Sequence, residues 1–209
     1  MDYIYLHGFA SSPNSAKANY LRQAFAELAI DLETPDLNLG NFSQLTITRQ
    51  IKQIEAEFPP PFAPVTLIGS SLGGLTAAWL AEKSLQVQRL VLLAPAFEFL
   101  SHWLPQLGEV KLKQWQDEQH LMVYHYAEMQ SLPLSYNFAI DAANYQDNQL
   151  LRPVPTLILH GLHDEVIPIA ASRNYAVSRP WVKLIELNSD HALADVMNQW
   201  QQIKSFIIP

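Results

Sequence analysis

Residues 69 to 73 limit the possible folds more than any other part of the chain, because they read Gly-Ser-Ser-Leu-Gly. The apolar run 65–68 precedes them, and the helix-like segment 72–81 follows them. A serine with a glycine two positions away on each side is typical of a sharp strand-to-helix turn that lifts the hydroxyl above a parallel sheet. Ser71 is therefore a candidate nucleophile. The alternative is a tight turn whose serine only caps the helix.

The spacing of apolar residues predicts an α/β fold. Strands are expected at 2–6, 29–34, 65–69, 89–94, 154–160 and 182–187. Amphipathic helical patterns lie between most of them, for example at 15–29 and at 44–58, where Ser43 is the expected N-cap. Several of the strands are apolar on both faces, as buried parallel strands are. We therefore predict one domain, residues 1–209, with a doubly wound, mainly parallel sheet of about six strands.

Residues 95–153 interrupt this alternation, since they contain no convincing buried strand and many aromatic residues. A connection of this length is uncommon and usually forms a lid or a binding insertion. We predict a helical lid, with Trp103 and Trp115 as candidate substrate-binding residues. The alternative is a helical layer packed on the sheet, in which the aromatic residues are ordinary core.

A serine nucleophile needs a base within hydrogen-bond reach and a third group that holds this base in the right tautomer. In the expected chain order, an acid and then a histidine follow the serine. Asp164 comes just after the fifth predicted strand, and His191 comes just after the sixth. The carboxyl ends of parallel strands share one edge of the sheet, so these side chains are expected to converge with Ser71.

Two further carboxylates lie close to these residues in the sequence. Asp190 directly precedes His191, and neighbouring side chains on an extended loop tend to point apart, so Asp190 is poorly placed to orient the imidazole. By the same argument only one of Asp164 and Glu165 faces the histidine. The residues alone leave the choice between these two open.

The first predicted strand ends in His7-Gly8-Phe9 at the same sheet edge. Acyl transfer needs two fixed donors for the negative charge that develops on the acyl oxygen. The backbone N–H groups of Leu72, directly after the serine, and of Phe9 are the expected pair. We interpret His7 itself as a packing histidine rather than as an acid or base.

A metal site is a minor alternative at the end of the fifth predicted strand. His160, His163 and Asp164 lie close together there, but nothing elsewhere completes a ligand set. We expect no metal and no cofactor. Three other histidines fall in the insertion and are interpreted as solvated or structural residues: His102, His120 and His125.

Charge and composition argue against several classes of partner. The chain of 209 residues has 20 acidic and 13 basic residues, a net charge of -7, and no run of basic residues. We therefore expect no nucleic-acid partner and no membrane surface. Cysteine is absent, which excludes disulfides and thiolate sites. No segment suits a signal or an anchor, so a cytoplasmic location is expected, and no feature sets an oligomeric state.

The sequence resembles the α/β-hydrolase superfamily and, more narrowly, its small YqiA-like esterase family. The resemblance spans the chain and rests on six segments: residues 5–9 (YLHGF), 11–13 (SSP), 15–18 (SAKA), 69–74 (GSSLGG), 164–166 (DEV) and 191–192 (HA). The segments 11–13 and 15–18 make it specific, because ordinary hydrolases share the His-Gly pair but not these residues.

The resemblance implies a role for each candidate residue. Ser71 is the nucleophile, Asp164 the acid, His191 the base, and the N–H groups of Phe9 and Leu72 the oxyanion hole. It also implies a sheet without the leading antiparallel hairpin of the superfamily.

The activity that the resemblance implies is that of a serine carboxylesterase or thioesterase, which cleaves small-molecule acyl esters or thioesters through an acyl-enzyme. A lyase or acyltransferase on the same triad, or a non-hydrolytic ligand receptor or scaffold, is the alternative.

Overall fold

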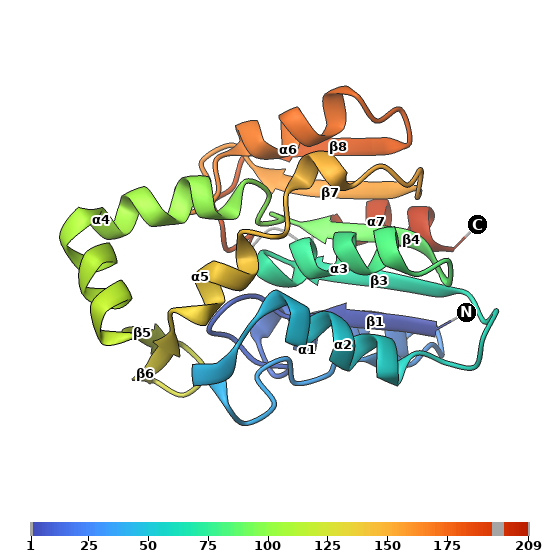
Figure 1. Cartoon of the computed structure of the whole chain (residues 1–209). Coiled ribbons are helices and arrows are strands. Elements are labelled where there is room, and N and C mark those ends of the chain that lie inside the picture. The colour runs from blue at the N-terminus through green and yellow to red at the C-terminus, as the bar shows by residue number, and fades with distance from the viewer. Residues whose placement is uncertain (1, 194–198, 209) are drawn as a thin grey trace.

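The computed structural model describes residues 2–193 and 199–208. A six-stranded sheet in the order β2-β1-β3-β4-β7-β8 forms its centre, and every pairing between neighbouring strands is parallel (Figure 1). The strands are β1 Asp2–Leu6, β2 Leu32–Glu33, β3 Val65–Ser70, β4 Val87–Leu93, β7 Thr156–Gly161 and β8 Val182–Leu187. The predicted doubly wound parallel sheet of six strands is confirmed.

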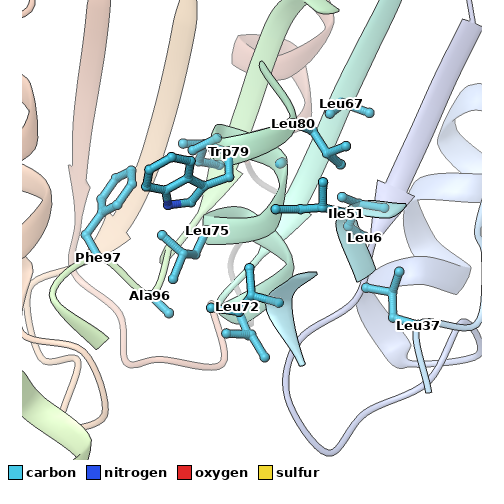
Figure 2. Close-up of a cluster of buried hydrophobic side chains, with 14 of the residues drawn as sticks. Leu6, Leu37, Ile51, Leu67, Leu72, Leu75, Trp79, Leu80, Ala96 and Phe97 are labelled. Carbon is cyan, nitrogen blue, oxygen red and sulfur yellow. The ribbon is translucent and has the colours of Figure 1, made fainter. Parts of the chain in front are cut away.

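Helices cover both faces of this sheet. Alternate residues of each strand point to opposite faces and pack in two separate hydrophobic cores. Tyr5 packs with α1 Ala16–Ala26 and α7 Trp200–Ile207 on one face. Leu6 packs on the other face, which is covered by α2 Ile47–Glu57, α3 Leu72–Lys83 and α6 Ile169–Val177. In the second core, Leu72, Leu75 and Trp79 of α3 are buried together with Leu6 and Ile51 (Figure 2). The helix that follows Ser71 is thus fixed by burial along its length.

Two local predictions need correction. The strand expected at 29–34 is reduced to Leu32–Glu33, because Ala29 and Ile30 still bond back to the last turn of α1. Ser43 does not cap the next helix, because it lies in a 3-10 turn, η1 Phe42–Gln44. The Thr46 side chain accepts from the Arg49 N–H at 3.0 Å and caps α2 instead.

The spacing of Met197, Trp200 and Ile203 in the sequence predicts one apolar face of a C-terminal helix. Met197 lies outside the described residues. Ile203 is fully buried, and the Trp200 ring packs at 5.4 Å from that of Phe25 in α1. This part of the helix therefore belongs to the core between α1 and the sheet.

The segment 95–153 is not purely helical, which corrects the expectation of a helical lid. It contains α4 Phe99–Glu118, an antiparallel hairpin of β5 His120–His125 and β6 Gln130–Ser135, α5 Asn137–Ala142 and a 3-10 turn, η2 Asp147–Gln149. Residues of β5 alternate between exposed and more buried positions, so the strand lacks the continuous apolar run of a buried strand. α4 is kinked at Gly108, which has a φ of 74°.

The insertion lies beyond the carboxyl ends of the sheet strands, with α4 and the hairpin extending away from the sheet at the left of the view (Figure 1). It therefore stands at the same edge as Ser71 and the other candidate residues. No helix within residues 2–193 and 199–208 is long and apolar enough to cross a membrane.

Candidate active site

Ser71 occupies the turn between β3 and α3 in a strained backbone conformation, with φ 52° and ψ -119°. Its N–H donates to Leu93 O at 2.9 Å, which ties the turn to the next strand. The glycines around it are required by close packing: a Cβ on Gly73 would lie 2.2 Å from Leu6 O, and one on Gly69 would lie 2.4 Å from Gly73 O. The G-x-S-x-G pattern thus forms the sharp turn that the sequence predicts.

Ser71, His191 and Asp164 lie in hydrogen-bond contact, although they are far apart in the chain. Ser71 Oγ lies 3.2 Å from Nε2 of His191, and Nδ1 of His191 lies 2.7 Å from Oδ2 of Asp164. The loops that carry the acid and the histidine approach each other closely at Gly161, where a Cβ would lie 2.4 Å from Ser189 O. The structure therefore brings together the three residues that the sequence singles out.

The Asp164 side chain is fully buried and held on several sides. Its Oδ1 accepts from the N–H groups of Val166 and Ile167 at 2.9 and 2.8 Å. Burial by itself raises the pKa of Asp164, but hydrogen bonds from His160 and His191 outweigh burial and hold the pKa well below its ordinary value. The residue is therefore a carboxylate throughout the neutral and mildly acidic range.

His160, for which the sequence suggests only a possible metal ligand, is also a residue of this site. It is fully buried, with Nε2 at 3.1 Å from Asp164 Oδ2 and Nδ1 at 2.7 Å from Ser172 Oγ. Its ring thus contacts the same carboxylate oxygen of Asp164 that His191 contacts. The signal in the sequence is a histidine that follows Leu157-Ile158-Leu159 in a buried strand, where a polar side chain requires a partner.

Glu165 and Asp190 do not contact His191 in the described structure. Both side chains are exposed, and Asp190 Oδ1 accepts from the Ala192 N–H at 2.9 Å, which caps the turn that carries the histidine. The geometry therefore singles out Asp164 among the three neighbouring carboxylates.

The turn after β1 packs directly against the serine. A Cβ on Gly8 would lie 3.3 Å from both Ser70 O and Ser71 Cβ. Leu72 is the first residue of α3, where an N–H has no acceptor within its own helix. Within the described residues, neither the Phe9 N–H nor the Leu72 N–H donates to a protein acceptor. Neither N–H group is therefore engaged by a competing acceptor within the described residues.

His7 is buried beneath this turn. Its Nε2 accepts from the Leu37 N–H at 3.0 Å, and its Nδ1 lies 2.9 Å from Gly8 O. Burial lowers the pKa of His7. These contacts fit the interpretation as a packing histidine, which holds the turn in place.

A cavity of about 820 Å³ opens beside Ser71 and His191. Phe9 and Trp103 line it on the side of the insertion. Trp115 does not line it: its indole is fully buried, donates from Nε1 to Leu134 O at 2.9 Å, and meets the Trp103 ring at 5.4 Å. The two tryptophans predicted as substrate-binding residues therefore occupy different positions, and Trp115 instead borders a neighbouring cavity of about 360 Å³.

The histidines considered for metal binding have other surroundings. His163 is exposed, and its Nε2 lies 2.8 Å from Asn188 Oδ1. Within the described residues, no group of three or more His, Cys, Asp or Glu side chains is arranged to hold a metal ion. In the insertion, His125 is buried beside Asn38, His102 lies 3.3 Å from Glu98, and His120 is exposed.

Comparison with known protein families fits this architecture. A model of the uncharacterised protein family UPF0227 matches residues 2–208. The chain belongs to this family. The UPF0227 match includes the turn at Ser71, Asp164 and His191. It confirms the predicted resemblance to the YqiA-like group within the α/β-hydrolase superfamily.

Solved structures share the fold of this UPF0227 chain at low sequence identity. Mouse alpha/beta hydrolase domain-containing protein 10 has a TM-score of 0.82 and 22% identity, with 99% of this chain and 89% of that chain covered. A protein from Agrobacterium vitis has a TM-score of 0.84 and 22% identity, with 99% and 87% covered. Est1E from Butyrivibrio proteoclasticus, with ferulic acid bound, has a TM-score of 0.79 and 19% identity, with 98% and 87% covered. The UPF0227 chain therefore has the α/β-hydrolase fold.

Proposed function

We propose that this protein is a serine carboxylesterase or thioesterase that works through an acyl-enzyme on Ser71. The observation that carries the proposal is the continuous contact from Ser71 Oγ through His191 to the buried Asp164 carboxylate, at 3.2 and 2.7 Å. A serine hydroxyl is a weak nucleophile, and this arrangement supplies the base and the group that orients it.

The geometry supports a two-step reaction. His191 Nε2 takes the proton of Ser71 Oγ as the oxygen attacks the acyl carbon, and then gives that proton to the leaving alcohol or thiol. A water molecule, deprotonated by the same nitrogen, then cleaves the acyl-enzyme and regenerates the serine. Asp164 keeps the proton of His191 on Nδ1 and stabilises the imidazolium that forms in each step.

The backbone amides complete this mechanism. In each tetrahedral intermediate the acyl oxygen carries a negative charge, which fixed N–H donors stabilise most strongly where water is excluded. The N–H groups of Phe9 and Leu72 are the donors that we assign to it. Gly8 allows this approach because a side chain there would press on Ser71 Cβ.

The comparisons support a hydrolase at the level of reaction class. Several proteins of the same fold are described as hydrolases, and Est1E was solved with ferulic acid bound. The cavity of about 820 Å³ has the size of an ordinary small-molecule site. A small acyl ester or thioester is therefore the substrate class that we assign.

Reaction with a fluorophosphonate tests the proposal, because such a probe phosphonylates an activated serine far faster than an ordinary hydroxyl group. Intact-mass measurement and peptide mapping should give one adduct per chain, on Ser71. Ser71→Ala should give none, whereas Ser70→Ala, the neighbouring serine, should still be labelled. Absence of an adduct on wild-type protein would contradict the proposal and favour a ligand receptor on the same fold.

A further inference from the structure

The entrance of the cavity beside Ser71 has an aromatic wall on the side of the insertion. Tyr124, in β5, and Tyr126, just after it, both line the cavity, and their ring centroids lie 5.3 Å apart with the planes at 85°. The two side chains are 50% and 74% exposed. Because both side chains are at least half exposed, part of each ring is available to a ligand rather than used in the core.

Carboxylates stand on the other wall. Glu165 follows the acid after β7, Asp190 precedes the histidine after β8, and both line the same cavity. Neither has an ion-pair partner within residues 2–193 and 199–208. Of the described residues that line the cavity, none is a lysine or an arginine. The entrance therefore carries a surplus of negative charge.

One basic side chain outside the cavity lining acts on these carboxylates. Lys17, in α1, interacts electrostatically with Asp164 and Asp190 and does not line the cavity. Burial lowers the pKa of Lys17 to about 8, so part of its charge is lost in mildly alkaline solution. Its charge acts on Asp164 and Asp190, and Glu165 is not among the groups that it interacts with.

We propose that this entrance binds an ammonium group on the leaving alcohol or thiol of the substrate. This inference rests on the proposed function and names the substrate class of that site. A cation is attracted by the face of a tyrosine ring and by nearby carboxylates at once. A neutral ligand uses only the rings and leaves carboxylates beside an apolar group, and an anionic carrier finds no basic partner on these walls.

The position of His191 indicates that the ammonium group belongs to the leaving group of the substrate and not to its acyl group. His191 Nε2 must protonate the leaving atom as the bond from this atom to the acyl carbon breaks and the bond from Ser71 Oγ to that carbon remains. The leaving group therefore lies along the loops that carry His191 and Asp164. Those loops also carry Asp190 and Glu165, so the charge of the leaving group meets these carboxylates.

Three thioacetates with leaving groups of different charge test the inference. They are acetylthiocholine, its neutral isostere S-(3,3-dimethylbutyl) thioacetate, and the anionic S-acetyl-3-mercaptopropionate. Thiol release can be followed with a thiol reagent, since the chain has no cysteine that would react. We expect kcat/KM for the cationic ester to exceed that of the neutral one by about tenfold at low salt, mainly through KM, and the excess to shrink as salt screens the carboxylates. The anionic ester should be the poorest substrate.

Variants locate the effect. Glu165→Gln, Asp190→Asn and Tyr126→Leu should each reduce the ratio of cationic to neutral kcat/KM by several-fold, since each removes one attractive element. The amide at position 190 can still accept the Ala192 N–H, so the turn is retained. Asp31→Asn is the matched control: it removes one exposed charge at the amino edge of the sheet, just before β2, and should leave the ratio unchanged.

The outcomes separate this inference from the proposed function. Hydrolysis that depends on Ser71 but shows a cationic-to-neutral ratio of one or less overturns the ammonium site and leaves the serine hydrolase standing. If none of the three esters is hydrolysed, calorimetry on Ser71→Ala decides the binding question alone. Salt-sensitive binding of choline that 3,3-dimethylbutanol does not match supports the site, and equal or absent choline binding contradicts it.

Discussion

The two walls of the cavity around Ser71 are built by different means. The wall formed by the strand ends is fixed by contacts that exclude even a methyl group, as at Gly73 and Gly161, and its acid is fully buried. The wall formed by the insertion consists of a helix kinked at Gly108 and a hairpin whose tyrosines are half exposed or more. One backbone hydrogen bond, from Tyr126 N–H to Ala10 O at 3.0 Å, ties the hairpin to the turn after β1.

This difference assigns separate tasks to the two walls. Chemistry requires reacting groups held within a fraction of an ångström, and such precision comes from packed strand ends. Selection among substrates requires contact area and charge, which exposed side chains supply. Substitutions in the wall formed by the strand ends, the first wall, should therefore affect turnover. Substitutions in the wall formed by the insertion, the second wall, should affect KM and substrate preference.

The largest expected effect is that of Ser71→Ala. Removal of the hydroxyl should lower kcat for a p-nitrophenyl ester by on the order of a million-fold, because the triad acts as a unit. The thermal midpoint Tm should stay close to that of the wild type, because the backbone at this turn is held by its neighbours. A variant that keeps a tenth of the activity would contradict the assignment of Ser71 as the nucleophile.

Asp164→Asn should have the next largest effect, a loss in kcat on the order of ten-thousand-fold, because the amide favours the wrong tautomer of His191. Glu165→Gln and Asp190→Asn are matched controls and should each cost less than about tenfold with a neutral ester. Steady-state kinetics on the three variants checks this order. Collapse of activity in either control, with Asp164→Asn still active, would reassign the acid.

The tryptophans of the insertion should separate selectivity from stability. Trp103→Ala should change KM and the preference among acetyl to octanoyl esters by several-fold, with a smaller change in turnover of the acetyl ester, since Trp103 lines the cavity. Trp115→Ala should instead lower the free energy of unfolding by about 3–5 kcal/mol, because its indole is fully buried. Kinetics across the ester series and denaturant unfolding of both variants provide the test. Unchanged selectivity in Trp103→Ala would favour a purely structural insertion.

The smallest effect concerns the dependence of stability on pH. The folded structure lowers the pKa of Asp164, so its carboxylate contributes stability above the pKa of an unfolded aspartate, about 3.9, and this contribution is lost as the pH falls toward the folded-state value. Asp164→Asn should therefore show a shallower fall of Tm below about pH 5 than the wild type does. Calorimetric scans of both proteins measure the two slopes, and identical slopes would contradict the lowered pKa.

The first wall is largely predictable from the sequence, and the second is not. Short motifs at the ends of apolar strands predict the strand-to-helix turn at Ser71 and the two loops that carry Asp164 and His191. The apolar strands themselves predict the sheet. The contact between His160 and Asp164 is not predictable in this way, because it depends on the depth of the strand end in the core. Only the folded chain shows that this histidine packs against the acid.

The insertion is harder to predict because its elements are stabilised by one-sided burial. β5 alternates between exposed and buried residues over six positions, and β6 contains Pro133, so neither gives the signal of a buried strand. Trp103 and Trp115 are equivalent as sequence features. Only the hydrogen bond from Trp115 to Leu134 O and the exposure of each ring distinguish a core residue from a lining residue.

The central claim is that acyl transfer passes through Ser71 on the rigid wall. The most direct measurement is rapid mixing with a p-nitrophenyl ester, acid quench within the first turnover, and mass analysis of the peptides. The account predicts an acyl group on the peptide that contains Ser71, formed together with the first equivalent of p-nitrophenol and absent from Ser71→Ala. Release of p-nitrophenol that persists in Ser71→Ala, or an acyl group on another residue of the wild type, would contradict it.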